Sequence, residues 1–206
     1  MSGIVVLISG RGSNLRAIVE AGLPVRAVIS DRRDAAGLAI AAEHRIAVDV
    51  LERRDFADRD SFDAALRALI DPHDPDVVAL AGFMRILGTA FVDQYAGRLV
   101  NIHPSLLPGF PGLHTHERAL AAGVAVHGAT VHLVTSELDR GPILLQAVVP
   151  VRRDDDAERL AARVLAQEHR IYPLALRWLL GGFVAIEAGQ VRIRGEPPRA
   201  IFPDRP

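Results

Sequence analysis

Short runs of β-branched and other apolar residues alternate, in the first half of the chain, with stretches whose apolar residues recur every three or four positions. The runs are typical of buried strands, and the spacing of three and four is typical of one face of a helix. The expected strands are residues 4–9, 25–30, 47–50, 77–81 and 99–103, and the helical stripes comprise Leu15, Ile18 and Val19, then Phe62, Ala65, Leu66 and Leu69. This alternation predicts an α/β fold with a Rossmann-like, mostly parallel twisted sheet and helices on both faces.

The second half changes character after Pro104, where a loop rich in proline and glycine precedes a short helix from Thr115. Apolar runs at residues 129–134 and 143–151 predict two further strands of the same sheet. A long helix is expected over residues 155–172. The segment "FVAIEAGQVRI", residues 183–193, predicts a terminal hairpin that turns at Ala188 and Gly189.

Length and composition narrow the classes of protein. The 206 residues fit one domain, 1–206, since domains commonly reach roughly 100–250 residues. The formal charge is −1 with arginines spread along the chain, which disfavours nucleic acid and anionic membranes as partners. The chain has no cysteine, and all 24 basic residues are arginine, which excludes thiolate, Schiff-base and Walker-lysine chemistry.

The apolar segments do not predict a targeting or spanning segment. The N-terminal run lacks a basic region and enters a glycine-rich loop directly, so a first strand is expected rather than a signal peptide. The stretch "LALRWLLGGFVAI" contains Arg177 and is shorter than the roughly 20 residues that span a bilayer. We therefore expect a cytoplasmic enzyme or binding protein.

The segment "ISGRGSNL", residues 8–15, places Gly10 and Gly12 between the first strand and the first helix. Glycines let the backbone approach a ligand closely, and the free N–H groups of a helix start favour an anion. Ser13 and Asn14 add polar donors or a cap. Leu15 replaces the third glycine of a dinucleotide fingerprint, so a monophosphate site and a plain turn both stay open.

Asn101 and His103 lie two residues apart at the end of an expected strand, so both side chains project to one face at the carboxyl edge of the sheet. A neutral amide and an imidazolium are both donors that suit a developing oxyanion. Asp139, in the turn "SELDRGP", could stabilise the charged imidazole. Taken singly, each residue also fits an ordinary turn or strand-end role.

Other polar residues carry weaker signals. His114 and His116 have a spacing that could bind metal, but no third ligand follows from the sequence, and structural roles are favoured. His132 fits either a core histidine or a neighbour of Asp139. Asp31, at the end of the second strand, is expected to be a capping or solvated residue rather than a ribose-binding acid.

Six segments occur together in one order: "GRGSNL", "AGFMRIL", "NIHPSLLPGFPGLHTH", "HGATVHLV", "ELDRGPILLQ" and "QEHRIYP". In these segments the chain resembles the folate-dependent formyltransferases, specifically the phosphoribosylglycinamide formyltransferase family. The resemblance implies transfer of a formyl group from 10-formyltetrahydrofolate to the amine of glycinamide ribonucleotide, in de novo purine (IMP) biosynthesis and without a metal. It also implies a phosphate-binding half, residues 1–100, and a catalytic and folate-binding half, residues 101–206.

The resemblance assigns roles to individual residues. It implies that Asn101, His103 and Asp139 are catalytic, with Asn101 also contacting the folate. The remaining expected contacts are Gly12, Ser13 and Asn14 with the substrate phosphate, and Met84, Arg85, Ile86 and Leu87 with the folate, through the backbone of Arg85 and Leu87 for the pterin.

Three roles that the resemblance implies keep an alternative, and two of them, those of Arg59 and Glu168, add to the contacts above. Arg59 is expected either to reach a folate carboxylate or to be a solvated arginine at a helix start. Glu168 lies on an apolar stripe, where an unpaired charge is costly, and is expected to bind the substrate ribose or to pair with an arginine. Core packing is the alternative for Met84 and Ile86, as for Phe83.

Two positions depart from the family pattern and leave details of recognition open. Arg140 stands where relatives often carry a small residue, and Leu165 stands where some relatives offer a polar contact to the ribose. The rival activities are formyltetrahydrofolate hydrolysis and a non-catalytic nucleotide-binding module. The sequence does not fix the oligomeric state, so a homodimer stays open.

Overall fold

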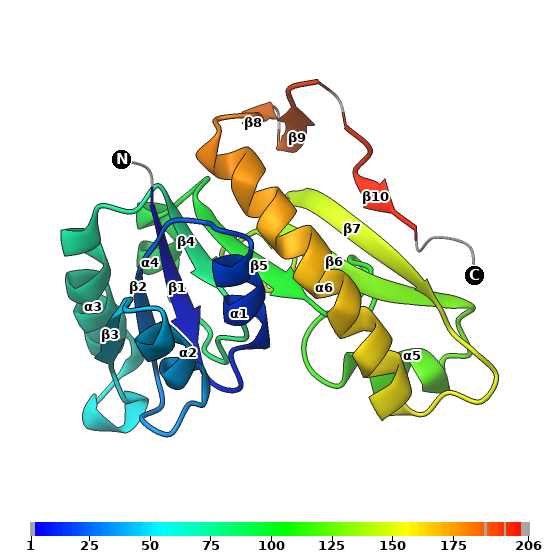
Figure 1. The fold of residues 1–206 in the computed structure, drawn as a ribbon, viewed down its shortest axis with the longest axis horizontal. Helices are drawn as coiled ribbons and strands as arrows, with labels where there is room; N and C mark the ends of the chain where they lie inside the picture. The colour runs from blue at the N-terminus through cyan, green and yellow to red at the C-terminus, as the bar shows by residue number, and fades with distance from the viewer. Residues whose placement is uncertain (1–2, 188, 196, 203–206) are drawn as a thin grey trace.

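A computed structural model of the chain describes residues 3–187, 189–195 and 197–202. Its main element is one eight-stranded sheet with the strand order β10-β7-β6-β5-β4-β1-β2-β3 (Figure 1). The strands are β1 (Ile4–Ile8), β2 (Val25–Ser30), β3 (Ala47–Val50), β4 (Val77–Leu80), β5 (Leu99–His103), β6 (Val126–Leu133), β7 (Ile143–Pro150) and β10 (Ala200–Ile201). Strands β1 to β5 are mutually parallel, whereas β6 is antiparallel to both β5 and β7. The expected single-domain α/β fold with a mostly parallel sheet is confirmed.

Helices cover both faces of the sheet because alternate strand residues point to opposite sides. The α-helices are α1 (Ser13–Glu20), α2 (Gly37–Glu43), α3 (Arg59–Ile70), α4 (Thr89–Gln94), α5 (Thr115–Ala121) and α6 (Ala157–Leu180), with 3-10 turns η1 (Arg53–Asp55) and η2 (Asp71–His73). Ile4, Val6 and Ile8 of β1 belong to the core beneath α1 and α6. Val5 and Leu7 belong to the core beneath α3 and α4. Each such buried side chain contributes about 1.5–3 kcal/mol to folding.

Helix α6 is longer than the sequence predicts. It starts at Ala157, where Asp156 accepts a hydrogen bond from the Arg159 N–H, and it continues through Pro173 to Leu180. The predicted end at residue 172 was wrong, since a proline disfavours but does not forbid a helix. Residues on both sides of the proline, including Tyr172 and Leu176, are buried in the core, and this burial offsets the lost backbone hydrogen bond.

The C-terminal hairpin is present as β8 (Val184–Glu187) and β9 (Gln190–Ile193), which pair antiparallel. Gly189 of its predicted turn has a positive φ, while Ala188 lies outside the described residues. Strand β10, which pairs parallel with β7, was not predicted because two residues give no period. Strand β6 begins three residues before the predicted start. No helix in the described part of the chain is long and apolar enough to cross a membrane.

Candidate active site

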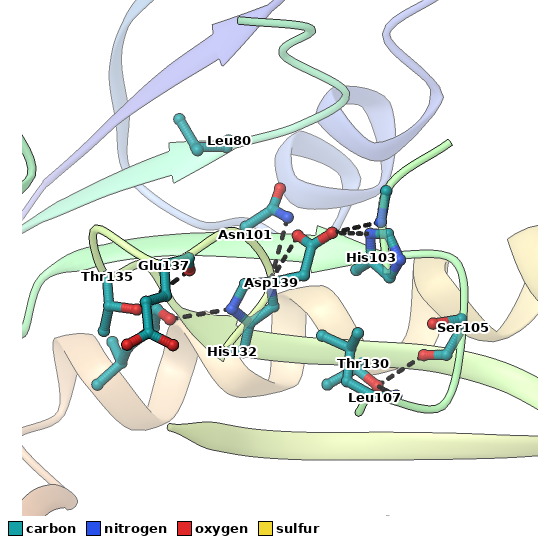
Figure 2. A network of polar contacts seen from close by, with 12 residues as sticks. Leu80, Asn101, His103, Ser105, Leu107, Thr130, His132, Thr135, Glu137 and Asp139 are labelled. Atoms are coloured by element: carbon teal, nitrogen blue, oxygen red, sulfur yellow. Dashed lines mark hydrogen bonds and ion pairs between the residues drawn. The ribbon is translucent and has the colours of Figure 1, made fainter. Parts of the chain in front are cut away.

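Strands β5 and β6 present one face to the core and the other to a cleft. Val100, Ile102 and Val131 pack in the core that α6 covers. Because side chains alternate along a strand, Asn101 and His103 project from the opposite face of β5. The antiparallel register pairs Asn101 with His132 of β6. Sheet geometry therefore brings these three side chains together, as Figure 2 shows.

The tautomer of His132 follows from its contacts. Its Nδ1 lies 2.9 Å from the backbone oxygen of Leu133, which can only accept, so Nδ1 carries the proton. Burial lowers the pKa of His132, which favours the neutral ring. Nε2 is then an acceptor, and it lies 3.2 Å from Nδ2 of Asn101, which donates. This contact fixes the orientation of the Asn101 amide and leaves its second N–H available.

His103 and Asp139 face each other at the same end of β5. The Nδ1 atom of His103 lies 3.5 Å from Oδ2 of Asp139, and the two side chains are only 8 % and 7 % exposed. Oδ2 also accepts a hydrogen bond of 2.8 Å from the Gly112 N–H, while Oδ1 lies 3.8 Å from Nε2 of His132. The other ring nitrogen of His103 lies 3.1 Å from the carbonyl oxygen of Phe110. Both ring nitrogens of His103 therefore face oxygen acceptors.

Three of the five non-glycine residues with positive φ in the described part of the chain lie beside these contacts, whereas Arg45 and Asp74 lie elsewhere. Phe110, His114 and Asp139 are non-glycine residues with φ values of 52°, 56° and 53°. Such left-handed conformations cost about 1–3 kcal/mol each and persist where the surrounding structure holds them. Here they turn the Phe110 carbonyl toward His103 and aim the Asp139 carboxylate between the two imidazoles. Strained backbone therefore supports two of the contacts of the polar cluster.

Buried hydrogen bonds hold the loop that carries Phe110. The hydroxyl of Thr130 donates to the Ser105 carbonyl over 2.7 Å and accepts from the Leu107 N–H over 3.0 Å. The side-chain amide of Gln146 donates to the same hydroxyl and to the Leu107 carbonyl. Strands β6 and β7 thus fix the loop after His103, a role that the sequence did not reveal.

A cleft of about 550 Å³ opens beside the polar cluster, and Asn101, His103, His132 and Asp139 all line it. Its rim contains four large apolar side chains that are more than half exposed, namely Met84, Ile86, Leu113 and Leu138. Exposed apolar groups gathered in one place mark a binding surface for a ligand with apolar parts.

The segment "AGFMRIL" contains both residues that pack in the core and residues that line the cleft. Phe83 is buried in the core, as the packing alternative holds, whereas Met84 and Ile86 are exposed in the cleft. Arg85 and Leu87 line the cleft as well. Leu113 and Leu138 were not predicted to line the cleft, although Leu113 lies within the longest sequence motif and Leu138 is next to Asp139.

Three polar groups anchor the loop of residues 84–88. The Met84 N–H donates to the Ser9 hydroxyl over 2.8 Å, and the Gly88 N–H donates to Asp63 over 2.7 Å. Burial raises the pKa of Asp63. The Arg85 guanidinium pairs with Asp31. Asp31 is buried, so its predicted role as a capping or solvated residue was wrong.

Arg59 is the first residue of α3, which begins with a capping box formed by Asp58 and Ser61. The Arg59 side chain is exposed, and it does not line the cleft. Its Nε lies 3.7 Å from the point where Gly88 would carry a Cβ. Arg59 therefore flanks the loop of residues 84–88 from outside.

The glycine-rich loop leads into α1 as the sequence predicts. Gly12 has a φ of 74°, and a Cβ there would lie 2.5 Å from the Cα of Gly37, so only glycine fits. No side chain caps α1, which leaves the N–H groups of its first turn without a side-chain acceptor. Ser13 lines a neighbouring cavity of about 450 Å³ together with Arg11, Arg16 and His169.

Asn14 and Glu168 join the two halves of the chain. The Asn14 amide donates a 2.7 Å hydrogen bond to Oε2 of Glu168, and both residues are buried. Burial raises the pKa of Glu168, although the Asn14 hydrogen bond and the charge of Arg11 oppose the shift. The donor is an amide rather than the arginine that the structural alternative required. Leu165, on the same helix, is half-buried.

The remaining candidate site residues lie outside the group formed by Asn101, His103, His132 and Asp139. His114 is exposed and 3.7 Å from Glu117, while the ring of His116 packs edge-on against His127 at 5.3 Å. Within the described ranges, no three histidine, cysteine or carboxylate groups converge as a metal site would require. Arg140 is exposed and does not line the cleft.

Comparisons with known proteins agree with this geometry. The family model described as formyl transferase matches residues 2–176. Phosphoribosylglycinamide formyltransferase of Escherichia coli (strain K12) is 50% identical over 209 residues, which cover 98% of this chain and 99% of the relative. The solved structure of phosphoribosylglycinamide formyltransferase from Coxiella burnetii has a TM-score of 0.93 and 46% identity, covering 97% of this chain and 99% of its own. A formyltetrahydrofolate deformylase from Pseudomonas syringae pv. tomato has a TM-score of 0.87 and 28% identity, covering 93% and 65%.

Proposed function

Because the chain belongs to the formyl transferase family, we propose that it catalyses transfer of a formyl group from 10-formyltetrahydrofolate to the amine of glycinamide ribonucleotide. A formyl-transferring activity in purine biosynthesis, expected from the motifs, is confirmed by relatives that match nearly the whole chain. The identity of the donor and the roles of individual residues are the proposal.

One observation carries these roles. Asn101, His103 and Asp139 come from two separated parts of the sequence, and their side chains converge on the wall of a cleft with an apolar rim. A flat, partly aromatic folate fits such a cleft, because its ring can cover Met84 and Ile86 while its polar edge meets the backbone groups of residues 85–87.

Asn101 and His103 are the donors for the negative charge that collects on the formyl oxygen when the amine attacks its carbon. The Asn101 amide has a second N–H after its contact with His132, and its charge state is independent of pH. His103 acts as an imidazolium, since acceptor oxygens face both of its nitrogens. Donors fixed in advance of the reaction lower the barrier without reorganising.

Asp139 holds the charge on His103 and takes part in moving one proton. In the overall step, a bond forms between the amine nitrogen and the formyl carbon, and the bond from that carbon to the folate nitrogen breaks. The amine loses one proton and the folate nitrogen gains one. The Asp139 carboxylate, which faces the cleft, positions the water that relays this proton.

The glycine-rich loop is the proposed phosphate site of the substrate. Gly12, Ser13 and Asn14 begin α1, whose first N–H groups and dipole attract an anion. Glu168 would accept hydrogen bonds from the ribose hydroxyls once it exchanges part of its contact with Asn14. Both the loop and the cleft lie at the carboxyl ends of the parallel strands, where open α/β sheets bind ligands.

The second candidate activity is hydrolysis of formyltetrahydrofolate, which the similarity to a deformylase structure favours. One assay separates the candidates: release of tetrahydrofolate from 10-formyltetrahydrofolate is followed with and without glycinamide ribonucleotide. Turnover that requires glycinamide ribonucleotide supports transfer. Turnover without it supports hydrolysis, and no turnover in either case would leave only ligand binding.

A further inference from the structure

The short segment of residues 110–113 touches both members of the pair formed by His103 and Asp139. The carbonyl oxygen of Phe110 lies 3.1 Å from Nε2 of His103. Two residues later, the Gly112 N–H donates a 2.8 Å hydrogen bond to Oδ2 of Asp139. The distances within the proposed catalytic pair therefore depend on where the backbone of this segment is held.

Arg118, on helix α5, holds the same segment with its side chain. Its Nη1 donates to the carbonyl oxygen of Pro111 over 2.5 Å and to that of Leu113 over 3.3 Å. The carbon of its guanidinium group lies 5.8 Å from the centre of the Phe110 ring, within the range of a cation–π contact. One side chain thus contacts three of the four residues, through two backbone oxygens and one ring.

Helix α5 gives Arg118 a fixed base. The next residue, Ala119, is fully buried in the core that α6 covers, and Thr115 at the start of the helix is buried as well. The Arg118 N–H also donates to the His114 carbonyl over 3.1 Å. The backbone of Arg118 is therefore anchored to the core, while its exposed side chain reaches the segment.

The loop after His103 is held at two places. Thr130 and Gln146 fix its first part, around Leu107, from strands β6 and β7. Arg118 fixes the second part from α5. Its partners are backbone oxygens and a ring rather than a carboxylate, and a planar guanidinium suits several acceptors at once better than an ammonium does. The positive charge of Arg118 is thus directed at the backbone of the loop.

We propose that Arg118 is a positioning residue for formyl transfer, because it sets where the Phe110 carbonyl and the Gly112 N–H meet His103 and Asp139. This inference rests on the proposed roles of His103 and Asp139. Arg118 does not line the cleft, so it acts only through the segment of residues 110–113. A displacement of about 1 Å in a catalytic group can lower the rate by up to about 10²-fold.

The test variant is Arg118→Met, which keeps most of the apolar stem and removes the charge and all donors. Two exposed hydrogen bonds and one cation–π contact are worth roughly two- to fivefold each, so together they favour the observed segment by about 10- to 100-fold. We expect kcat to fall about five- to twentyfold at saturating substrates. The KM for glycinamide ribonucleotide should stay within about twofold, because Arg118 lies outside the proposed phosphate and ribose contacts.

The conservative variant is Arg118→Lys. Its ammonium keeps the charge and can still donate to the carbonyl oxygens, although it lacks the planar fork. We expect its kcat to lie between those of Arg118→Met and the wild type.

Arg98→Met is the matched control. Arg98 also donates to a backbone carbonyl, that of Pro75 over 2.8 Å, and also lies over an aromatic ring, that of Tyr95 at 5.1 Å. It lies at the amino ends of β4 and β5, the edge of the sheet opposite the polar cluster. Its loss should lower Tm by a few degrees and leave kcat at the wild-type value.

Hydrogen exchange of the Gly112 amide, measured by NMR, reports on the segment without turnover. This N–H is protected by its hydrogen bond to Asp139. Because exchange requires the segment to open, Arg118→Met should accelerate it at least about tenfold, and Arg98→Met should not change it.

Four results would overturn the positioning role: a kcat of Arg118→Met within twofold of wild type, an equal loss of kcat in Arg98→Met, a lysine variant no more active than the methionine variant, or an unchanged exchange rate at Gly112. A wild-type protein without turnover contradicts the proposed function instead. The exchange rates at Gly112 then still decide whether Arg118 holds the segment.

Discussion

Replacing Asp139 by asparagine tests the polar cluster most directly. Asparagine has nearly the same shape and tolerates the left-handed backbone of position 139, where φ is 53°, better than alanine. Its side-chain oxygen can still accept from the Gly112 N–H. The substitution therefore removes the negative charge beside His103 with little change in geometry.

The expected magnitude follows from the separation of the two charges. Nδ1 of His103 and Oδ2 of Asp139 are 3.5 Å apart, which at an effective dielectric constant of about 20 corresponds to about 5 kcal/mol as an upper bound. Losing one oxyanion donor in comparable sites costs about 10²–10³ in rate. We expect Asp139→Asn to lower kcat by about 10²–10³, because the remaining donor, Asn101, is unaffected.

The assay is steady-state tetrahydrofolate release with glycinamide ribonucleotide present, together with thermal unfolding of the variant. Asp154→Asn, at an exposed carboxylate before α6, is the matched control and should retain full activity. The Tm of Asp139→Asn should stay within a few degrees of wild type. A folded Asp139→Asn variant with kcat within threefold of wild type would refute the assigned role.

Three further predictions concern the surroundings of the site. Gly12→Ala should lower Tm and raise the KM for glycinamide ribonucleotide, since its Cβ would meet Gly37 at 2.5 Å and left-handed backbone costs about 1–2 kcal/mol without glycine. Burial lowers the pKa of His127 to about 4, so the free energy of unfolding, measured by urea titration, should fall as pH drops below about 6.5 and level off below about 4. The loss is on the order of 3 kcal/mol, and His127→Gln should flatten that slope. Met84→Ser should raise the KM for formyl folate severalfold at unchanged Tm, because the side chain is exposed and contributes apolar area only to a bound ligand.

The sequence predicted most of the fold because the local patterns agree with the tertiary structure. The five parallel strands begin at the expected residues, and their alternating side chains divide between the two cores. The errors lie where a long-range contact outweighs a local preference. Pro173 locally favours the end of a helix, but burial of the following turn extends α6 to Leu180.

Part of the candidate site could also be predicted from the sequence pattern. Two residues on one face of a strand end, and a carboxylate in a later turn, were enough to predict the group of Asn101, His103 and Asp139, which the structure brings together. The contact of the Phe110 carbonyl with His103 could not be predicted, because every residue has a backbone oxygen and the residue type does not show which one faces the site. The cluster of charged side chains from residues 31–34, 52–54 and 85 could not be predicted either, because it depends on how three separate segments meet in the fold.

The change from parallel to antiparallel pairing at β5 explains why the polar cluster forms at this strand. A parallel neighbour would need a crossover helix, and the chain after β5 would then cover the sheet face that now borders the cleft. Instead β6 returns antiparallel beside β5, which places His132 directly opposite Asn101 and Thr130 opposite His103. Asn101 and His103 are presented to the cleft. His132, which also lines it, fixes the Asn101 amide, and Thr130 fixes the loop after His103. Since a shift of one residue in this register would turn every side chain to the other face, the pairing of β5 with β6 determines the geometry of the site as much as the identity of its residues does.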